Sequence, residues 1–169
     1  MKNLIKIAAV LLLMLTMSGV SAQKFAHINS QELLAAMPES DSAQAAIQKL
    51  ADNYQTQLEE MQVELNKKYD DYLNNRDSYT DLIKQTKESE ISDLQQRIQQ
   101  FQEIASQELQ NKRTELLRPI LDKANAAIKA VAQANNFIYV FDISAGNPIY
   151  FSDQSVDIMQ LVKDKLGLK

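Results

Sequence analysis

Residues 47–79 read IQKLADNYQTQLEEMQVELNKKYDDYLNNRDSY, and the spacing of the apolar residues in this stretch decides the fold. They recur alternately three and four residues apart, which is the heptad spacing of a helix that packs along another helix. One repeating position holds Ile47, Tyr54, Met61, Lys68 and Asn75, and the other holds Ala51, Leu58, Leu65, Tyr72 and Tyr79. Because the outer half of this seam takes up polar residues, we expect its far end to be packed more loosely.

The region around this stretch, residues 39–145, contains no glycine and one proline, Pro119, and is rich in residues that favour helix. A single helix of that length would be far outside the usual range for a compact domain. We therefore expect an antiparallel helical hairpin, or arm. Turn-forming residues concentrate at 74–80 (NNRDSYT), which places the tip there, with Ser78 or Thr80 as the cap of the returning helix.

We expect the arm to span residues 41–117, with its outgoing helix starting at a cap among residues 40–42. The returning helix changes its repeat toward the base of the arm. Ile98, Leu109 and Ile120 lie eleven residues apart, a spacing that removes the left-handed supercoil and predicts straighter helices there.

Pro119 lies inside the apolar pattern of the returning helix. A proline within a helix removes one backbone hydrogen bond and crowds the preceding turn. We therefore expect a kink and a hinge at Pro119, followed by a second helix that runs to about residue 135.

We expect residues 23–40 and 118–169 to form a body. Residues 24–29 (KFAHIN) and 137–142 (FIYVFD) have the composition of strands, and residues 149–151 predict a short third strand. Three short strands bury too little apolar surface to be stable alone, so we expect an obligate oligomer whose copies pool their strands. The expected fold class is α+β and predominantly helical, with a long antiparallel coiled-coil hairpin projecting from a small β-rich oligomerisation body.

Two short helices complete the expected body. One covers residues 31–37, ahead of the arm. The other closes the chain over residues 156–166, with Ser155 or Asp157 as its cap and Gly167 as its stop.

Residues 1–22 have the pattern of a secretory signal peptide. Lys2 and Lys6 precede a largely apolar run over residues 7–17, and Ala22 ends a group of small residues of the kind that signal peptidase cleaves after. We expect an exported protein that is cleaved after Ala22; a retained membrane anchor is the alternative. The chain has no cysteine, which excludes a lipoprotein anchor and any disulfide.

The sequence contains no enzyme signature. His27 is the only histidine and lies on an expected strand, where a structural role is the simplest interpretation. One histidine and no cysteine make a zinc or redox metal site a poor fit. After residue 22 the only glycines are Gly146 and Gly167, so there is no glycine-rich phosphate loop. We expect no catalysis, no metal and no cofactor.

The charge of the chain is concentrated in the arm. Without Lys2 and Lys6, 16 basic side chains oppose 22 acidic ones, a net charge of −6. Residues 51–117 alone contain eight basic and fourteen acidic side chains. An acidic chain without a basic face is a poor nucleic-acid binder, and its charge gives no support to membrane contact, which otherwise stays open.

Five adaptable or aromatic side chains of the arm are candidate contact residues for a binding partner. They are Met61, Tyr69, Tyr72, Tyr79 and Phe101. Tyr72 and Tyr79 occupy seam positions, so packing is their simplest role, whereas Tyr69 lies off the seam. For the group as a whole, packing within the arm and contact with a partner are both open.

Three segments resemble the Skp/OmpH family of periplasmic chaperones, and the resemblance covers nearly all of the chain after residue 22. They are LLAAMPES at residues 33–40, RPILDKANAAIKAVAQANNFIYVFD at 118–142 and IYFSDQSVDIMQLVKDKL at 149–166. The resemblance implies a homotrimer with a β-rich body and three helical arms that enclose a cavity. It also implies a periplasmic location and ATP-independent binding of unfolded outer-membrane β-barrel proteins, the clients of the chaperone.

The acidic arm departs from the family, whose best-known members are basic. For that reason we carry over no lipopolysaccharide site. Two functions follow from the sequence: a holdase chaperone that shields unfolded clients, or an exported coiled-coil adaptor that binds one folded envelope partner. A holdase would bind several unrelated unfolded β-barrel proteins, whereas an adaptor would bind one folded protein and give no protection against aggregation.

Overall fold

The computed structural model describes residues 24–146 and 148–168, so the expected signal peptide lies outside the described residues. The chain divides into two compact units. Of the described residues, 24–31 and those from Ala127 onward form the sheet unit, and Glu32–Ala126 form the hairpin unit. Within the described residues, no helix combines the length and the apolar character needed to cross a membrane.

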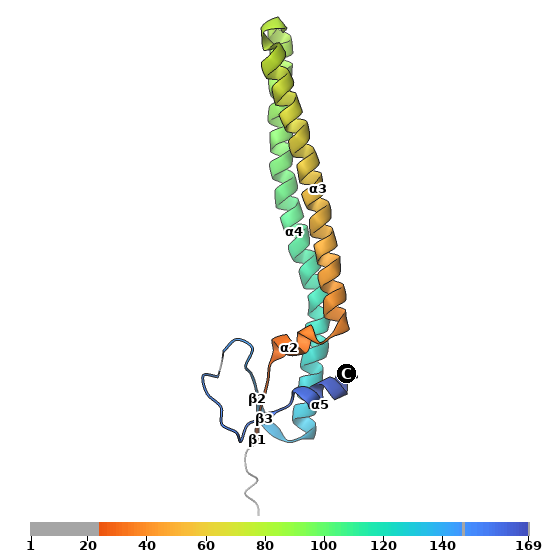
Figure 1. Cartoon of the computed structure of the whole chain (residues 1–169), viewed down its shortest axis with the longest axis vertical. Coiled ribbons are helices and arrows are strands. Elements are labelled where there is room, and N and C mark those ends of the chain that lie inside the picture. The colour runs from red at the N-terminus through yellow and green to blue at the C-terminus, as the bar shows by residue number, and fades with distance from the viewer. Residues whose placement is uncertain (1–23, 147, 169) are drawn as a thin grey trace, which may run out of the picture. The chain divides into compact units, whose positions relative to one another are not determined.

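Two long helices dominate the hairpin unit. Helix α3 (Pro38–Asn75) and helix α4 (Asp81–Ala134) run side by side in opposite directions (Figure 1). They are joined by the short 3-10 helix η1 (Arg76–Ser78), which lies within the stretch expected to form the tip. Thr80 precedes α4, and its hydroxyl accepts a hydrogen bond from the amide of Ile83 at 3.4 Å. The helical hairpin and the small sheet confirm the predicted fold class.

The seam between α3 and α4 follows the spacing expected from the sequence. Its buried side chains are apolar and lie along one stripe of each helix: Ala43 and Ile47 on α3, and Ile91, Leu94, Ile98, Ala105, Ile120 and Ala124 on α4. The outer seam residues of α3 are half-buried, and Asn75 at its end is exposed. An amphipathic stripe on each helix therefore buries its apolar face against the other helix.

Helix α3 begins earlier than expected. The sequence predicted a start at residue 41 after a cap among residues 40–42, but the helix starts at Pro38. Proline suits the first helical position because its fixed φ is helical and its missing N–H is not needed there. The preceding residue, Met37, makes no side-chain cap bond, and the hydroxyl of Ser42 instead donates to the carbonyl of Pro38 at 3.2 Å.

The prediction of a separate second helix after Pro119 is also wrong. Helix α4 continues through Pro119 to Ala134 without interruption. The proline removes one hydrogen bond, but packing of the turns on both sides can hold the helix together, as it often overrides local propensity. The kink and the hinge remain predictions.

The sheet unit contains a parallel sheet of three strands in the order β2-β1-β3. Strand β1 (Lys24–Ile28) is central, with β2 (Phe137–Asp142) on one side and β3 (Val156–Asp157) on the other. Asn136, with φ of 57°, makes the left-handed step from α4 into β2. Ala26, Ile28, Ala127, Val131, Ile158 and Val162 are buried in this unit.

The third strand lies later in the chain than expected. Residues 149–151 belong to the connection between β2 and β3, and Ile149 is almost fully exposed. Because β2 and β3 flank opposite edges of β1, this connection must cross the sheet before β3 can pair. The closing helix α5 (Met159–Leu166) consequently starts three residues later than expected. Asp157 still accepts the Met159 amide at 2.8 Å, and Gly167 ends the helix with φ of 72°.

Candidate binding surfaces

Polar side chains link α3 to α4 along the whole seam and fix their pairing. Near the tip, Lys68 pairs with Glu90 at 2.9 Å and Lys87 with Asp71 at 3.4 Å. Near the base, the hydroxyl of Tyr54 donates a hydrogen bond to Glu108, and Lys123 pairs with Glu39 at 2.5 Å. As the residue number rises along α3, the number of its partner on α4 falls, as an antiparallel hairpin requires.

Tyrosines contribute to this linkage through their hydroxyl groups. Tyr72 donates to Glu88 of α4, whereas Tyr79, in the connection between the helices, donates back to Asp71 of α3 at 3.2 Å. The hydrogen bond to Glu108 raises the pKa of Tyr54, and the bond to Glu88 raises the pKa of Tyr72; desolvation adds to both shifts. Both phenols therefore remain protonated donors well into the alkaline range.

Four of the five predicted contact residues lie in or against the seam. Met61, Tyr72, Tyr79 and Phe101 are half-buried. Phe101 packs edge-to-face on Tyr54, with ring centroids 5.8 Å apart. This placement favours packing within the arm for these four side chains, and their contact with a partner stays a prediction.

Tyr69 is different, because half of its surface is exposed on the outside of α3. It is one of several large apolar side chains of the arm that lie outside the seam: Val63, Tyr69, Leu73, Leu82, Ile83, Ile104 and Leu121. Sequence reasoning singled out only Tyr69 from this set. The others could have been found as apolar residues that do not fit the heptad or eleven-residue spacing.

The sheet unit carries a second apolar surface, an aromatic stack on one face of the sheet. Phe25 of β1 stacks on Tyr139 of β2 with ring centroids 6.3 Å apart, and Tyr139 stacks on Phe141 at 6.0 Å. All three rings are exposed, and Tyr139 is the most accessible at 61%. A continuous aromatic ladder of this kind is a typical contact surface for another protein.

His27 holds the connection between β2 and β3 against the sheet. Its Nδ1 lies 2.9 Å from the hydroxyl of Ser155, and its ring lies 4.2 Å from that of Phe151. The histidine is buried. These contacts agree with the structural role expected for it. In the described chain, no group of three or more potential metal-binding side chains is present.

Asp142 joins the end of β2 to the start of helix α2 (Ser30–Ala35). Its carboxylate accepts hydrogen bonds from the Ser30 amide at 3.1 Å, the Ser30 hydroxyl at 2.5 Å and the Ser144 amide at 3.0 Å. Partial burial acts to raise the pKa of Asp142, but these hydrogen bonds outweigh it and lower the pKa to about 2. The carboxylate is therefore a structural group that fixes local geometry.

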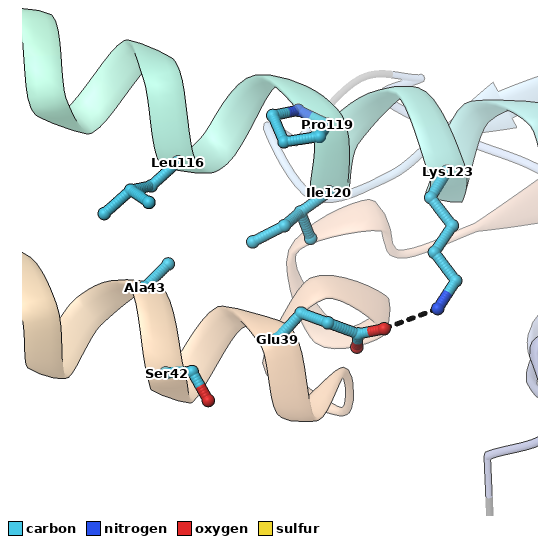
Figure 2. Close-up of a pocket in the computed structure, with 7 residues that line it drawn as sticks. All are labelled: Glu39, Ser42, Ala43, Leu116, Pro119, Ile120 and Lys123. Carbon is cyan, nitrogen blue, oxygen red and sulfur yellow. Dashed lines mark hydrogen bonds and ion pairs between the residues drawn. The ribbon is translucent and has the colours of Figure 1, made fainter.

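An open groove lies between α3 and α4 at the base of the arm (Figure 2). It has a volume of about 420 Å³, and its walls are mainly apolar. Ala43 projects from α3, and Leu116 and Ile120 face it from α4 beside Pro119. The Glu39–Lys123 ion pair closes one end.

Comparisons with known proteins agree with the fold and with the order of the segments. The family of outer membrane proteins described as OmpH-like matches residues 24–166. A solved OmpH-like structure from Caulobacter crescentus CB15, provisionally assigned as an outer membrane chaperone, superposes with a TM-score of 0.72 at 13% sequence identity. The match covers 88% of this chain and 86% of that chain, and at this identity it shows the fold alone. No curated protein matches the chain.

Proposed function

Because the chain belongs to the OmpH-like family of outer membrane proteins, we propose that it is an ATP-independent periplasmic holdase for unfolded outer-membrane β-barrel proteins. In this proposal the helical arms shield the apolar segments of a client and prevent its aggregation. The signal-peptide pattern of residues 1–22 supports an exported protein.

The observation that carries the proposal is the set of apolar side chains exposed along the arm. A two-helix hairpin needs its seam residues for stability but has no need of Tyr69, Leu73, Leu82 or Ile104 on its outside. Scattered contacts of this kind are individually weak and undemanding about sequence. Several together can hold an unfolded chain through effective concentration while each one remains reversible.

The proposal includes an oligomer, with the trimer that the family resemblance implies as its expected form. The three-stranded sheet is small, β2 is an edge strand of it, and the aromatic stack of Phe25, Tyr139 and Phe141 is exposed. Unpaired strand edges and exposed aromatic faces are both covered readily by another copy of the same chain. Several arms around a shared body would create a cavity for the client.

The test is native mass spectrometry of residues 23–169 as a urea-unfolded outer-membrane β-barrel protein is diluted into it. Light scattering of the same mixture measures client aggregation. We expect one client chain per oligomer and suppression of aggregation, with similar results for a second, unrelated β-barrel protein. An oligomer that ignores both clients, or binds only one folded envelope protein, would contradict the holdase and favour the adaptor.

A variant sharpens this test. Tyr69→Ser removes an exposed aromatic from the arm and leaves the seam intact, so we expect client affinity to fall about fivefold, the scale of one partly buried apolar contact. Tyr150→Ser is the matched control, because Tyr150 is an exposed tyrosine of the sheet unit. Equal effects of the two substitutions would remove Tyr69 from the client-contact surface.

A further inference from the structure

At the base of the arm, helix α4 lacks one backbone hydrogen bond, and a groove lies open beside that position. Pro119 has no amide hydrogen, so α4 lacks the bond that this position would make to the carbonyl of Glu115. The helix is continuous there, but this turn has one restraint fewer than its neighbours. Bending is consequently easier at Pro119 than elsewhere along the same helix.

A groove lies open along the seam beside Pro119. Ala43 is the α3 side chain that faces Leu116 and Ile120, and its single methyl group leaves the groove open (Figure 2). Side chains that line a void lose part of their dispersion contacts. Packing therefore resists separation of the helices less here than it would with a larger side chain at position 43, although Ala43 and Ile120 themselves are only 5% and 7% exposed.

One polar contact spans this weak segment beyond the proline. The Glu39 carboxylate, in the first turn of α3, accepts a hydrogen bond from Lys123, which lies one turn past Pro119 in α4. The two side chains are 45% and 49% exposed, so water and salt reach the pair. The hydrogen bond from Lys123 lowers the pKa of Glu39, which keeps the carboxylate ionised at neutral pH.

We propose that the Glu39–Lys123 ion pair is a salt-sensitive clasp that holds the two helices of the arm together across a hinge at Pro119. When the clasp is released, the start of α3 and the part of α4 beyond Pro119 separate and uncover the apolar groove wall. The inference concerns the hairpin alone and does not depend on whether the arm binds clients. It assigns to this pair a conformational role that an ordinary surface ion pair lacks.

The clasp can be tested by distance measurement, because the chain has no native cysteine. Spin labels on Ala45→Cys and Ala126→Cys report on the hinge, since both positions are exposed and lie on α3 and on α4 beyond Pro119. Labels on Asn66→Cys and Ser92→Cys report on the outer arm. Dilution of labelled chains with unlabelled ones removes distances between copies.

We expect Lys123→Ala to broaden the hinge distance distribution about twofold and to leave the outer-arm distribution unchanged. Raising the salt from about 50 mM to about 1 M should broaden the hinge distance distribution of the original protein in the same way, because screening weakens exposed ion pairs. It should not affect Lys123→Ala further. Exchanging the charges, as Glu39→Lys with Lys123→Glu, should restore the narrow distribution.

Two matched variants decide whether the position of the pair matters. Lys68→Ala breaks another ion pair between α3 and α4, in a part of the seam without proline. Lys68→Ala should leave the hinge distance distribution narrow. In a separate double variant, adding Pro119→Ala to Lys123→Ala should make the hinge distance distribution narrow again. Equal broadening by Lys68→Ala, or no broadening by Lys123→Ala, would overturn the clasp. Because no client is present, either result leaves the proposed holdase standing.

Discussion

The hairpin unit and the sheet unit bury their apolar residues in different ways. In the hairpin unit, α3 and α4 of the same chain supply both sides of the seam, and Leu94 within it is only 1% exposed. In the sheet unit, one face of β1 buries Ala26 and Ile28, but on the opposite face Phe25 of the aromatic stack stays 37% exposed.

The difference indicates where the stability of each unit originates. A long pair of helices can satisfy its backbone hydrogen bonds internally and bury a continuous stripe without outside help. A sheet of three short strands leaves two edges unpaired, and here it leaves stacked aromatic rings partly exposed, so in the proposed oligomer part of its stabilisation comes from other copies. The stability of the hairpin unit should depend on mutations in its own seam. The stability of the sheet unit should depend on mutations that affect association between copies.

The largest effect should come from the most buried side chain of the hairpin seam. Leu94→Ala removes a fully buried side chain and leaves a cavity, so we expect the free energy of unfolding to fall by about 3 kcal/mol. Urea unfolding followed by far-ultraviolet circular dichroism measures this change. Leu82→Ala is the control, because Leu82 is 74% exposed on the same helix and should cost less than about 0.5 kcal/mol. Similar costs for both would show that the seam is not the main source of stability.

A second prediction addresses the sheet face. Phe141→Ser removes one ring of the exposed stack, and we expect the dissociation constant of the oligomer to rise about thirtyfold, as for the loss of one buried aromatic. Sedimentation velocity over a range of concentrations measures this constant. Ile149→Ser removes an apolar side chain of the same unit that is 97% exposed and lies outside the stack. If Phe141→Ser and Ile149→Ser change the dissociation constant equally, or if neither changes it, the contact between copies does not lie at the aromatic stack.

The same contrast explains which features the sequence could predict. The seam of α3 was predictable because heptad spacing directly determines which side chains of a helix face a neighbour. The residues expected in the seam from Ile47 to Leu65 are all buried or half-buried. The turn signal at residues 74–80 was equally local, since asparagine, aspartate and serine compete there for the backbone.

The sheet unit was predicted less well because its structure depends on pairing between distant residues. Residues 149–151 have good strand composition, but β1 offers its second edge to Val156 and Asp157. Nothing in a local pattern shows that the chain must first cross the sheet. The exposed apolar residues of the arm were not predicted, because the repeat identifies only side chains that face the other helix and assigns no role to those outside it.

The smallest of the three effects concerns Asp142, which ties β2 to α2. Its pKa in the folded protein, about 2, lies below the ordinary value of 3.8, so ionisation of this carboxylate favours folding. The contribution is fully present above about pH 4 and is lost as the pH falls from about 4 to 2. Because water screens this largely exposed carboxylate, we expect it to contribute about 1 kcal/mol to the free energy of unfolding.

Asp142→Asn should therefore lower the free energy of unfolding by about 1 kcal/mol at pH 7, and the difference from the original protein should vanish as the pH approaches 2. Asp153→Asn is the control, because Asp153 is an exposed carboxylate of the same unit. Urea unfolding at several pH values measures both variants. A difference that stays constant down to pH 2 would mean that Asp142 acts through its shape rather than its charge. The tie between β2 and α2 would then depend on the fit of the carboxyl group, which an amide does not reproduce.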